Sequence, residues 1–150
     1  MTLVRPTTAR VQILLVEDDE AVRIMLMELL NREGYATLSA GDGLEASALL
    51  SEVTPELVIT DFNMPHMDGW ELALYVRRHL PDTPVLLVTG EPDGLAKAHH
   101  PASPFEAVLG KPFQLNSLLS MIRVLLNGDA ASERSFHGPE LSRQVQPELG

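Results

Sequence analysis

Acidic side chains stand directly after two short apolar segments of the chain. Glu17 and Asp18 follow the segment 11–16, and Asp61 follows 56–60. If these segments are neighbouring strands, the three carboxylates converge within several Å of one another. Two unit charges about 4 Å apart repel by about 4 kcal/mol at an effective dielectric constant near 20. A divalent cation relieves such repulsion, and oxygen ligands without histidine or cysteine favour Mg²⁺ or Mn²⁺.

A hydroxyl and an amine follow two further apolar segments. Thr89 ends 85–89, and Lys111 stands shortly after 105–109. A lysine beside carboxylates pairs with them, or with an anionic group placed on one of them, and Thr89 offers a hydroxyl to the same anion. An aspartate nucleophile, a metal ion and a lysine together suit phosphoryl transfer. These residues predict a carboxylate that becomes an acyl phosphate.

Short apolar runs alternate with longer amphipathic ones, which predicts strands alternating with helices. Asp19, Asp42 and Asp68 stand where helix N-caps are expected, and Gly34 stands where the first helix should end. The prolines between 91 and 104 leave room for only about two helical turns. Strands are expected at 11–16, 35–40, 56–60, 85–89 and 105–109, and helices at 20–33, 42–53, 68–79, 94–100 and 115–126.

Strand–helix alternation with nearly continuous apolar strands predicts an α/β fold, a doubly wound parallel sheet with helices on both faces. In such sheets the functional crevice lies at the carboxyl ends of the strands. We expect one domain over 11–127, an N-terminal extension at 1–10, and a C-terminal tail at 128–150 that is disordered or loosely attached.

Composition narrows the classes of function. The 150 residues carry a net charge of −10 with 45% hydrophobic residues and no cysteine. These values indicate a globular protein without disulfides or thiol chemistry. A pI near 4.8 argues against a nucleic-acid-binding surface. No apolar run is long enough for a membrane span, and no signal peptide is evident, so we expect a cytoplasmic protein.

Four separated motifs resemble the receiver domain of two-component response regulators. They are ILLVEDDEAVR, DFNMPHMDGWEL, PVLLVTG and LGKPF, and they occur in the order and at the spacing typical of that family. The resemblance covers about residues 11–127. It implies a flavodoxin-like, five-stranded parallel sheet of strand order 2-1-3-4-5.

The resemblance also implies a role for each site residue. Asp61 would be the phosphoacceptor, and Asp18 a direct ligand of Mg²⁺ (Mn²⁺ is the alternative). Glu17 would be an outer ligand that acts largely through water. Lys111 would hold the phosphoryl group, with a cis peptide before the proline that follows it, and Thr89 would move to bond that group.

Asn63 would lend its backbone carbonyl to the metal. Asn63 and Glu91 also match the family positions that tune the lifetime of the phosphoryl group. Two residues depart from the family pattern. Val108 stands where the family usually has Tyr or Phe, and Phe105 stands where a small residue is usual. These departures predict an unusual output face.

The leading hypothesis is a signalling module rather than an enzyme. A sensor histidine kinase or a histidine phosphotransfer protein would phosphorylate Asp61, and the loaded domain would act on a downstream protein. No DNA-binding output domain is expected, so the chain would be a stand-alone receiver or the C-terminal receiver of a hybrid histidine kinase. One alternative is a Mg²⁺-dependent phosphohydrolase that works through an aspartyl phosphate, although Asn63 stands where its general acid is needed. The other is a constitutive interaction module that does not switch.

Overall fold

A computed structural model describes residues 10–127 of the chain. The remaining residues, which include most of the expected extension and all of the expected tail, lie outside the described part. Strands and helices alternate throughout, as the sequence predicts. The strands are β1 (Gln12–Val16), β2 (Ala36–Ala40), β3 (Leu57–Thr60), β4 (Val85–Thr89) and β5 (Ala107–Gly110); the helices are α1 (Glu20–Arg32), α2 (Gly43–Leu50), α3 (Gly69–His79), α4 (Pro92–Ala98) and α5 (Leu115–Leu126).

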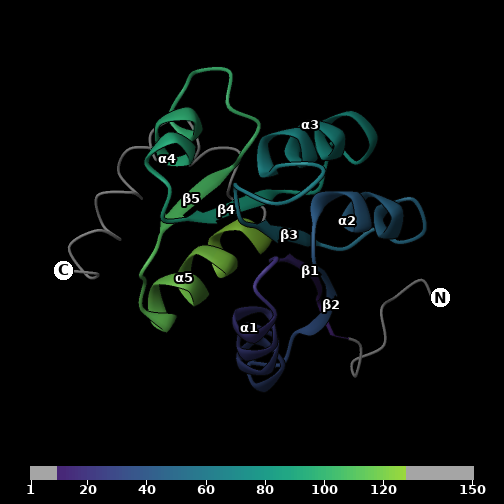
Figure 1. Ribbon diagram of the computed structural model, residues 1–150. Helices are drawn as coiled ribbons and strands as arrows, with labels where there is room; N and C mark the ends of the chain where they lie inside the picture. Colours follow the sequence, from purple (N-terminus) through teal and green to yellow (C-terminus); the bar gives the residue numbers. More distant parts are fainter. Residues whose placement is uncertain (1–9, 128–150) are drawn as a thin grey trace.

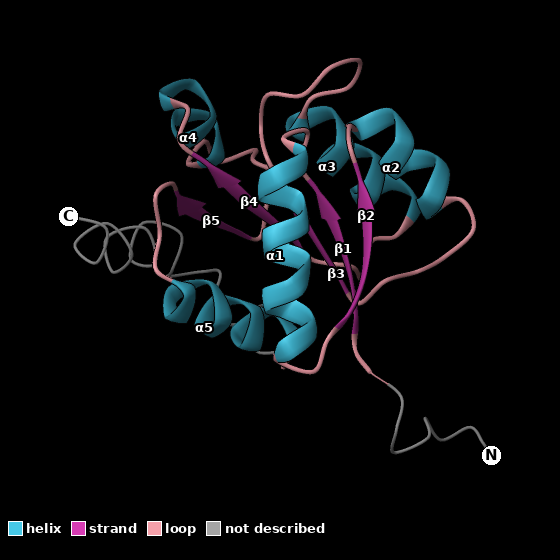
Figure 2. Cartoon of the chain, turned by 60° about the horizontal axis from the view of Figure 1, so that its bottom comes forward, coloured by secondary structure: helices cyan, strands magenta, loops and turns pink. Residues whose placement is uncertain are grey.

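The five strands form one parallel sheet of order β2-β1-β3-β4-β5, which confirms the expected fold class and strand order. β1 lies between β2 and β3, and Val16 pairs with Thr60 at the last position of the β1–β3 ladder. All five strands therefore end at the same edge of the sheet, as Figure 2 shows by the arrowheads. The residues that follow Val16 and Thr60 are brought together at that edge.

Helices cover both faces of the sheet (Figure 1). α1 and α5 pack on one face, and α2, α3 and α4 pack on the other. Alternate residues of a strand point to opposite faces, so Ile13 and Leu15 of β1 join the core under α1 and α5. Leu14 and Val16 join the core under the other three helices. This double burial explains the nearly continuous apolar composition of the strands.

The helix boundaries confirm the expected caps. The side chain of Asp19 accepts the N–H of Val22, and Asp68 forms a reciprocal capping box with Glu71. Gly34 follows α1 with a φ of 98°, a conformation that favours glycine. Within residues 10–127, no helix is long and apolar enough to cross a bilayer.

Three elements have a boundary that differs from the predicted one by two residues or more. α2 ends at Leu50 rather than at 53, because the Ser51 hydroxyl donates to the Ala48 carbonyl and the chain turns. α4 begins at Pro92 rather than at 94. Proline suits the first turn of a helix, where its missing N–H costs nothing.

The fifth strand is the third case, since it begins at Ala107 rather than at 105. The N–H of Phe105 donates to the hydroxyl of Ser103 in a turn, so the ladder with β4 starts later. One consequence is that Phe105 lies before the strand, and its buried ring packs in the core under α2, α3 and α4.

A buried ion pair joins α3 to the start of β5. Arg77 Nη1 lies 2.9 Å from Glu106 Oε2, and the Glu106 side chain is only 5% exposed. Glu106 Oε1 accepts the N–H of Val85 at 2.7 Å, and the Arg77 guanidinium donates to the carbonyls of Pro81 and Thr83. The pair lies at the opposite edge of the sheet from the strand ends that carry Asp61, so it stabilises the fold rather than the site.

Candidate functional site

Three carboxylates meet at the carboxyl ends of β1 and β3. Glu17 and Asp18 follow β1, and Asp61 follows β3. One carboxylate oxygen from each lies within 4.8 Å of the other two. Glu17 is buried, Asp61 is half-buried and Asp18 is exposed. The convergence expected from the sequence is therefore present, and it follows directly from the pairing of β1 with β3.

The amine of Lys111 lies against two of these carboxylates. Its Nζ is 3.0 Å from Glu17 Oε1 and 3.3 Å from Asp61 Oδ2. Burial alone lowers the pKa of the Lys111 amine. The hydrogen bond that the amine donates to Glu17, and the charges of Asp61 and Glu17, outweigh that effect, so the pKa of Lys111 lies above its ordinary value. The lysine is thus held as a cation beside the carboxylates, with its side chain 28% exposed.

Backbone contacts fix the position of Asp61. Its N–H donates to the Val16 carbonyl at 3.2 Å. Its Oδ1 accepts the N–H of Phe62 at 2.7 Å, and its own carbonyl accepts the hydroxyl of Thr60 at 2.9 Å. Gly69, the first residue of α3, lies so close to the Asp61 carbonyl that an added Cβ would overlap it. Neither of these contacts of Phe62 and Gly69 with Asp61 was predicted from the sequence.

Glu17 is held by its neighbours in a similar way. Its Oε2 accepts the N–H of Asp19 at 3.1 Å, and its carbonyl accepts Arg23 Nη1 at 2.7 Å. Arg23 lies on the first turns of α1 and was not predicted as part of the site. The only feature of the sequence that points to this contact is the spacing of six residues between Glu17 and Arg23. An arginine on the solvent side of a helix can have the same spacing, so the feature does not identify a site residue.

Thr89 is fully buried at the end of β4. Its hydroxyl oxygen accepts the N–H of Glu91 at 3.1 Å. Glu91 is the N-cap residue of α4, and its side chain makes no capping bond. The Thr89 hydroxyl therefore secures the connection between β4 and α4.

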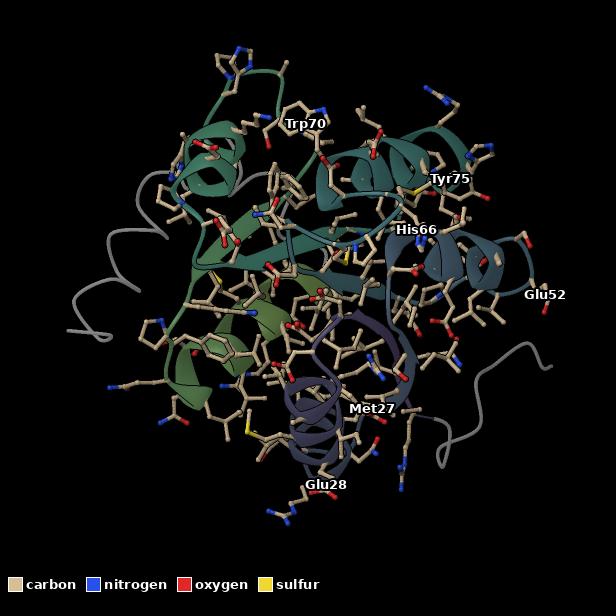
Figure 3. The ribbon with its side chains drawn as sticks, viewed as in Figure 1. Met27, Glu28, Glu52, His66, Trp70 and Tyr75 are labelled. Carbon is tan, nitrogen blue, oxygen red and sulfur yellow. The ribbon has the colours of Figure 1, made fainter. Side chains whose placement is uncertain are left out.

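The loop between β3 and α3 covers one side of the site. Asn63 is exposed in this loop. His66 has a φ of 72°, and its Nδ1 lies 3.2 Å from Asp42 Oδ2. In Figure 3 His66 lies between α3 and α2. The N–H of Glu45 and, to a smaller extent, the His66 ring hold the pKa of the Asp42 carboxyl below its ordinary value. This link ties the loop to the start of α2.

The two positions that depart from the family pattern are both buried. Val108 lies within β5, with 4% of its surface exposed. The ring of Phe105 packs edge-on against Trp70, with 6.0 Å between ring centroids. Figure 3 shows Trp70 at the end of α3 that faces α4. Val108 has no aromatic ring, and the ring of Phe105 is buried.

The residues present fit a hard divalent cation. They supply only oxygen donors, and these donors cluster at a half-exposed edge that an ion can reach. Mg²⁺ is usually bound by one or two carboxylates together with water and phosphate oxygens. The same arrangement places a cationic amine beside the Asp61 carboxylate. An Asp61 oxygen that lies between the positive charge of the Lys111 amine and that of a bound cation is suited to accept a phosphoryl group.

An apolar cavity of about 520 Å³ adjoins the site on the α1 side. Met25, one of its lining residues, is 51% exposed. The cavity is lined by Val22, Met25, Leu26, Leu29, Lys111, Pro112, Phe113 and Leu115. Lys111 therefore belongs both to the charged site and to the rim of this apolar surface.

Known proteins are similar to this chain in sequence. The family model of the response regulator receiver domain matches residues 13–123. The response regulator MprA of Mycobacterium sp. (strain KMS) is 35% identical over 123 residues, which are 82% of this chain and 54% of that protein. The chain thus spans about half the length of this relative.

Solved structures give the same result. The chemotaxis response regulator CheY4 of Vibrio cholerae has a TM-score of 0.72 and 32% identity, and the match covers 79% of this chain and all of that one. The response regulator TrrA of Thermotoga maritima, solved in complex with Mg²⁺-BeF, has a TM-score of 0.69 and 29% identity over 77% of this chain and 98% of that one. Together with the strand order and the acidic edge of the sheet, these matches show that the chain belongs to the response regulator receiver domain family.

Proposed function

We propose that this chain receives a phosphoryl group on Asp61 and signals through contact with another protein. The observation that carries the proposal is the position of the Lys111 amine, 3.3 Å from Asp61 Oδ2, beside two further carboxylates at the same edge of the sheet. An interaction module without phosphoryl chemistry has no need to hold a partly buried cation against two of three converging carboxylates.

The donor is a phosphohistidine of a sensor kinase or of a histidine phosphotransfer protein. The bond between the histidine nitrogen and phosphorus breaks, a carboxylate oxygen of Asp61 forms the new bond to phosphorus, and the electron pair stays on the histidine ring. Lys111 stabilises the negative charge on the transferred group. The Thr89 hydroxyl, at the end of the neighbouring strand, accepts the Glu91 N–H and would move to donate its O–H to the phosphoryl group.

Mg²⁺, when bound, neutralises charge on the phosphoryl oxygens and on the acceptor carboxylate. Asp18 and Asp61 would bind it directly, and Glu17 would act through water. The Asn63 backbone carbonyl would complete the protein ligands. The exposed Asn63 and Glu91 side chains flank the acceptor, so they are suited to tune how long the phosphoryl group persists.

The apolar cavity beside Lys111 is where we expect the phosphodonor protein to dock. The donor histidine must approach Asp61 from solvent, and this cavity begins at Lys111. The surface that we expect to fill this cavity is the apolar face of a helix of the donor protein, next to its phosphohistidine. Met25 offers a flexible side chain that adapts to such a surface.

Phosphorylation by a small acyl phosphate tests the proposal without any partner. The wild-type chain, incubated with acetyl phosphate and Mg²⁺, should gain the mass of one phosphoryl group, and chelation of Mg²⁺ should prevent the gain. Asp61→Asn should abolish it. Asp82→Asn, at an exposed turn, is the matched control and should be labelled like the wild type.

Stable label on Asp61→Asn would overturn the proposal. Turnover of small phosphomonoesters would instead favour the phosphohydrolase alternative. Nuclear magnetic resonance spectra that do not change on addition of beryllofluoride and Mg²⁺ would favour the constitutive interaction module.

A further inference from the structure

Two contacts of α4 lead to the proposed site. α4 is the shortest helix of the described residues, seven residues long, and Gly94 is its only buried residue. The first contact is the Thr89 hydroxyl, which accepts the Glu91 N–H at the N-cap. The second is the ring of Phe62, the residue that follows Asp61.

Phe62 and Gly94 are in tight contact. A Cβ added to Gly94 would lie 2.8 Å from Phe62 Cγ and 3.0 Å from Phe62 Cβ, so no space separates the helix from the ring. The ammonium of Lys97 also lies 5.5 Å from the centroid of that ring, within the range of a cation–π contact. Phe62 itself is buried, with 4% of its surface exposed. Any displacement of the ring therefore requires a displacement of α4.

The backbone of the same residue holds the acceptor carboxylate. The Phe62 N–H donates to Asp61 Oδ1 at 2.7 Å. A phosphoryl group or a cation on the carboxylate withdraws negative charge from Asp61 Oδ1, which makes that oxygen a weaker acceptor for the Phe62 N–H. A resulting shift of the Phe62 backbone and ring would reach α4 through the closely packed Gly94, because tightly packed groups transmit strain.

We propose that Phe62 positions the Asp61 carboxylate and passes its state to α4, in place of the aromatic residue that is missing at Val108. The inference rests on the proposed function, since it requires Asp61 to be loaded. It assigns the output of this chain to a change in α4, at the contact of Phe62 with Gly94 and Lys97.

Amide resonances of α4 report the proposed transmission. Beryllofluoride with Mg²⁺ serves as the probe that mimics the phosphoryl group. In the wild type, the resonances of Phe62 and of residues 92–98 should both shift. In Phe62→Leu, the shift near Asp61 should remain, while the shifts of 92–98 should fall by at least half. Leu95→Ala removes part of the apolar contact between α4 and the core but leaves the Phe62 ring in place, so this matched control should keep most of the α4 shift.

Coupling is reciprocal, so a change in α4 must alter binding at Asp61. Gly94→Ala forces a Cβ against the Phe62 ring, and it should change the affinity for beryllofluoride about fivefold or more. The same substitution in the Phe62→Leu background should have a smaller effect, because the obstructing ring is gone. Asp93→Ala, exposed on the same helix, should leave the affinity within about twofold of the wild type.

The outcomes separate the two proposals. No shift at Asp61 and Phe62 in the wild type overturns the proposed function, and with it the inference. Shifts at the site with an unchanged α4 response in Phe62→Leu overturn the inference alone. An effect of Gly94→Ala that is equally large with and without the Phe62 ring also overturns it, because the coupling would then not pass through this contact.

Discussion

The Lys111 ammonium lies 3.3 Å from Asp61 Oδ2, although 50 residues separate the two in the sequence. The peptide bond between Lys111 and the next residue, Pro112, is cis, as the family resemblance implies. The amine is shared with the buried Glu17, so one cation offsets two carboxylates. This relationship leads to two predictions, one on rate and one on stability.

Lys111→Met should slow phosphorylation by acetyl phosphate by a factor on the order of 100, the usual loss when one preorganised donor to a developing anion is removed. The initial rate at saturating Mg²⁺, followed by mass spectrometry, measures this change. Arg32→Met removes an exposed cation from the last turn of α1 and should leave the rate unchanged. A wild-type rate in Lys111→Met would contradict the assigned role.

The stability contributed by Lys111 should disappear at high pH. Its pKa in the folded state lies above the ordinary value of 10.5. The contribution is therefore fully present below pH 10.5 and is lost as the pH rises through the folded pKa. The difference in unfolding free energy between wild type and Lys111→Met, measured with chelator present, should be constant near neutral pH and decrease in alkali. A difference that grows with pH would contradict the pairing.

The site residues could be predicted from sequence because strand ends are easy to recognise. Glu17, Asp18, Asp61 and Lys111 each follow a short apolar run, and parallel strands bring their carboxyl ends to one edge. No side-chain geometry is needed to infer that they meet. The strand order itself came from the family resemblance, not from the pattern of apolar residues.

Contacts between elements could not be predicted in the same way. The packing of Phe62 on Gly94 joins residues 32 positions apart, and neither residue type carries a signal for its partner. The start of α4 was mispredicted because Pro92 was read as an interruption, whereas proline is accepted in a first helical turn. Boundaries and packing depend on the whole fold, while the site depends mainly on topology.

The ion pair between Arg77 and Glu106 should contribute strongly to stability. Glu106→Ala leaves the Arg77 guanidinium without its anion and the Val85 N–H without its acceptor. Removing one partner of a buried pair costs about 3–5 kcal/mol, and urea unfolding measures this loss. Glu52→Ala, in the exposed turn that follows α2 and labelled in Figure 3, should change stability by less than about 0.5 kcal/mol. An equal effect of the two substitutions would contradict the assignment.

Met25→Glu should separate phosphorylation by a protein donor from phosphorylation by a small donor. The side chain is 51% exposed on the apolar cavity that adjoins Lys111, so a carboxylate there opposes the docking of an apolar helix surface. A loss of about 1.4 kcal/mol in docking lowers transfer tenfold. The protein donor in this experiment is a histidine phosphotransfer protein in its phosphorylated form. It is chosen because it transfers its phosphoryl group to the wild-type chain.

The rate with acetyl phosphate should stay unchanged in Met25→Glu, because that donor needs no protein surface. Leu74→Glu is the matched control: Leu74 is also a partly exposed apolar residue, 40% exposed, but it lies on α3, on the other face of the sheet. It should leave both rates unchanged. Equal transfer to Met25→Glu and to the wild type from the protein donor would place the docking surface elsewhere, whereas equal losses with both donors would show damage to the site itself.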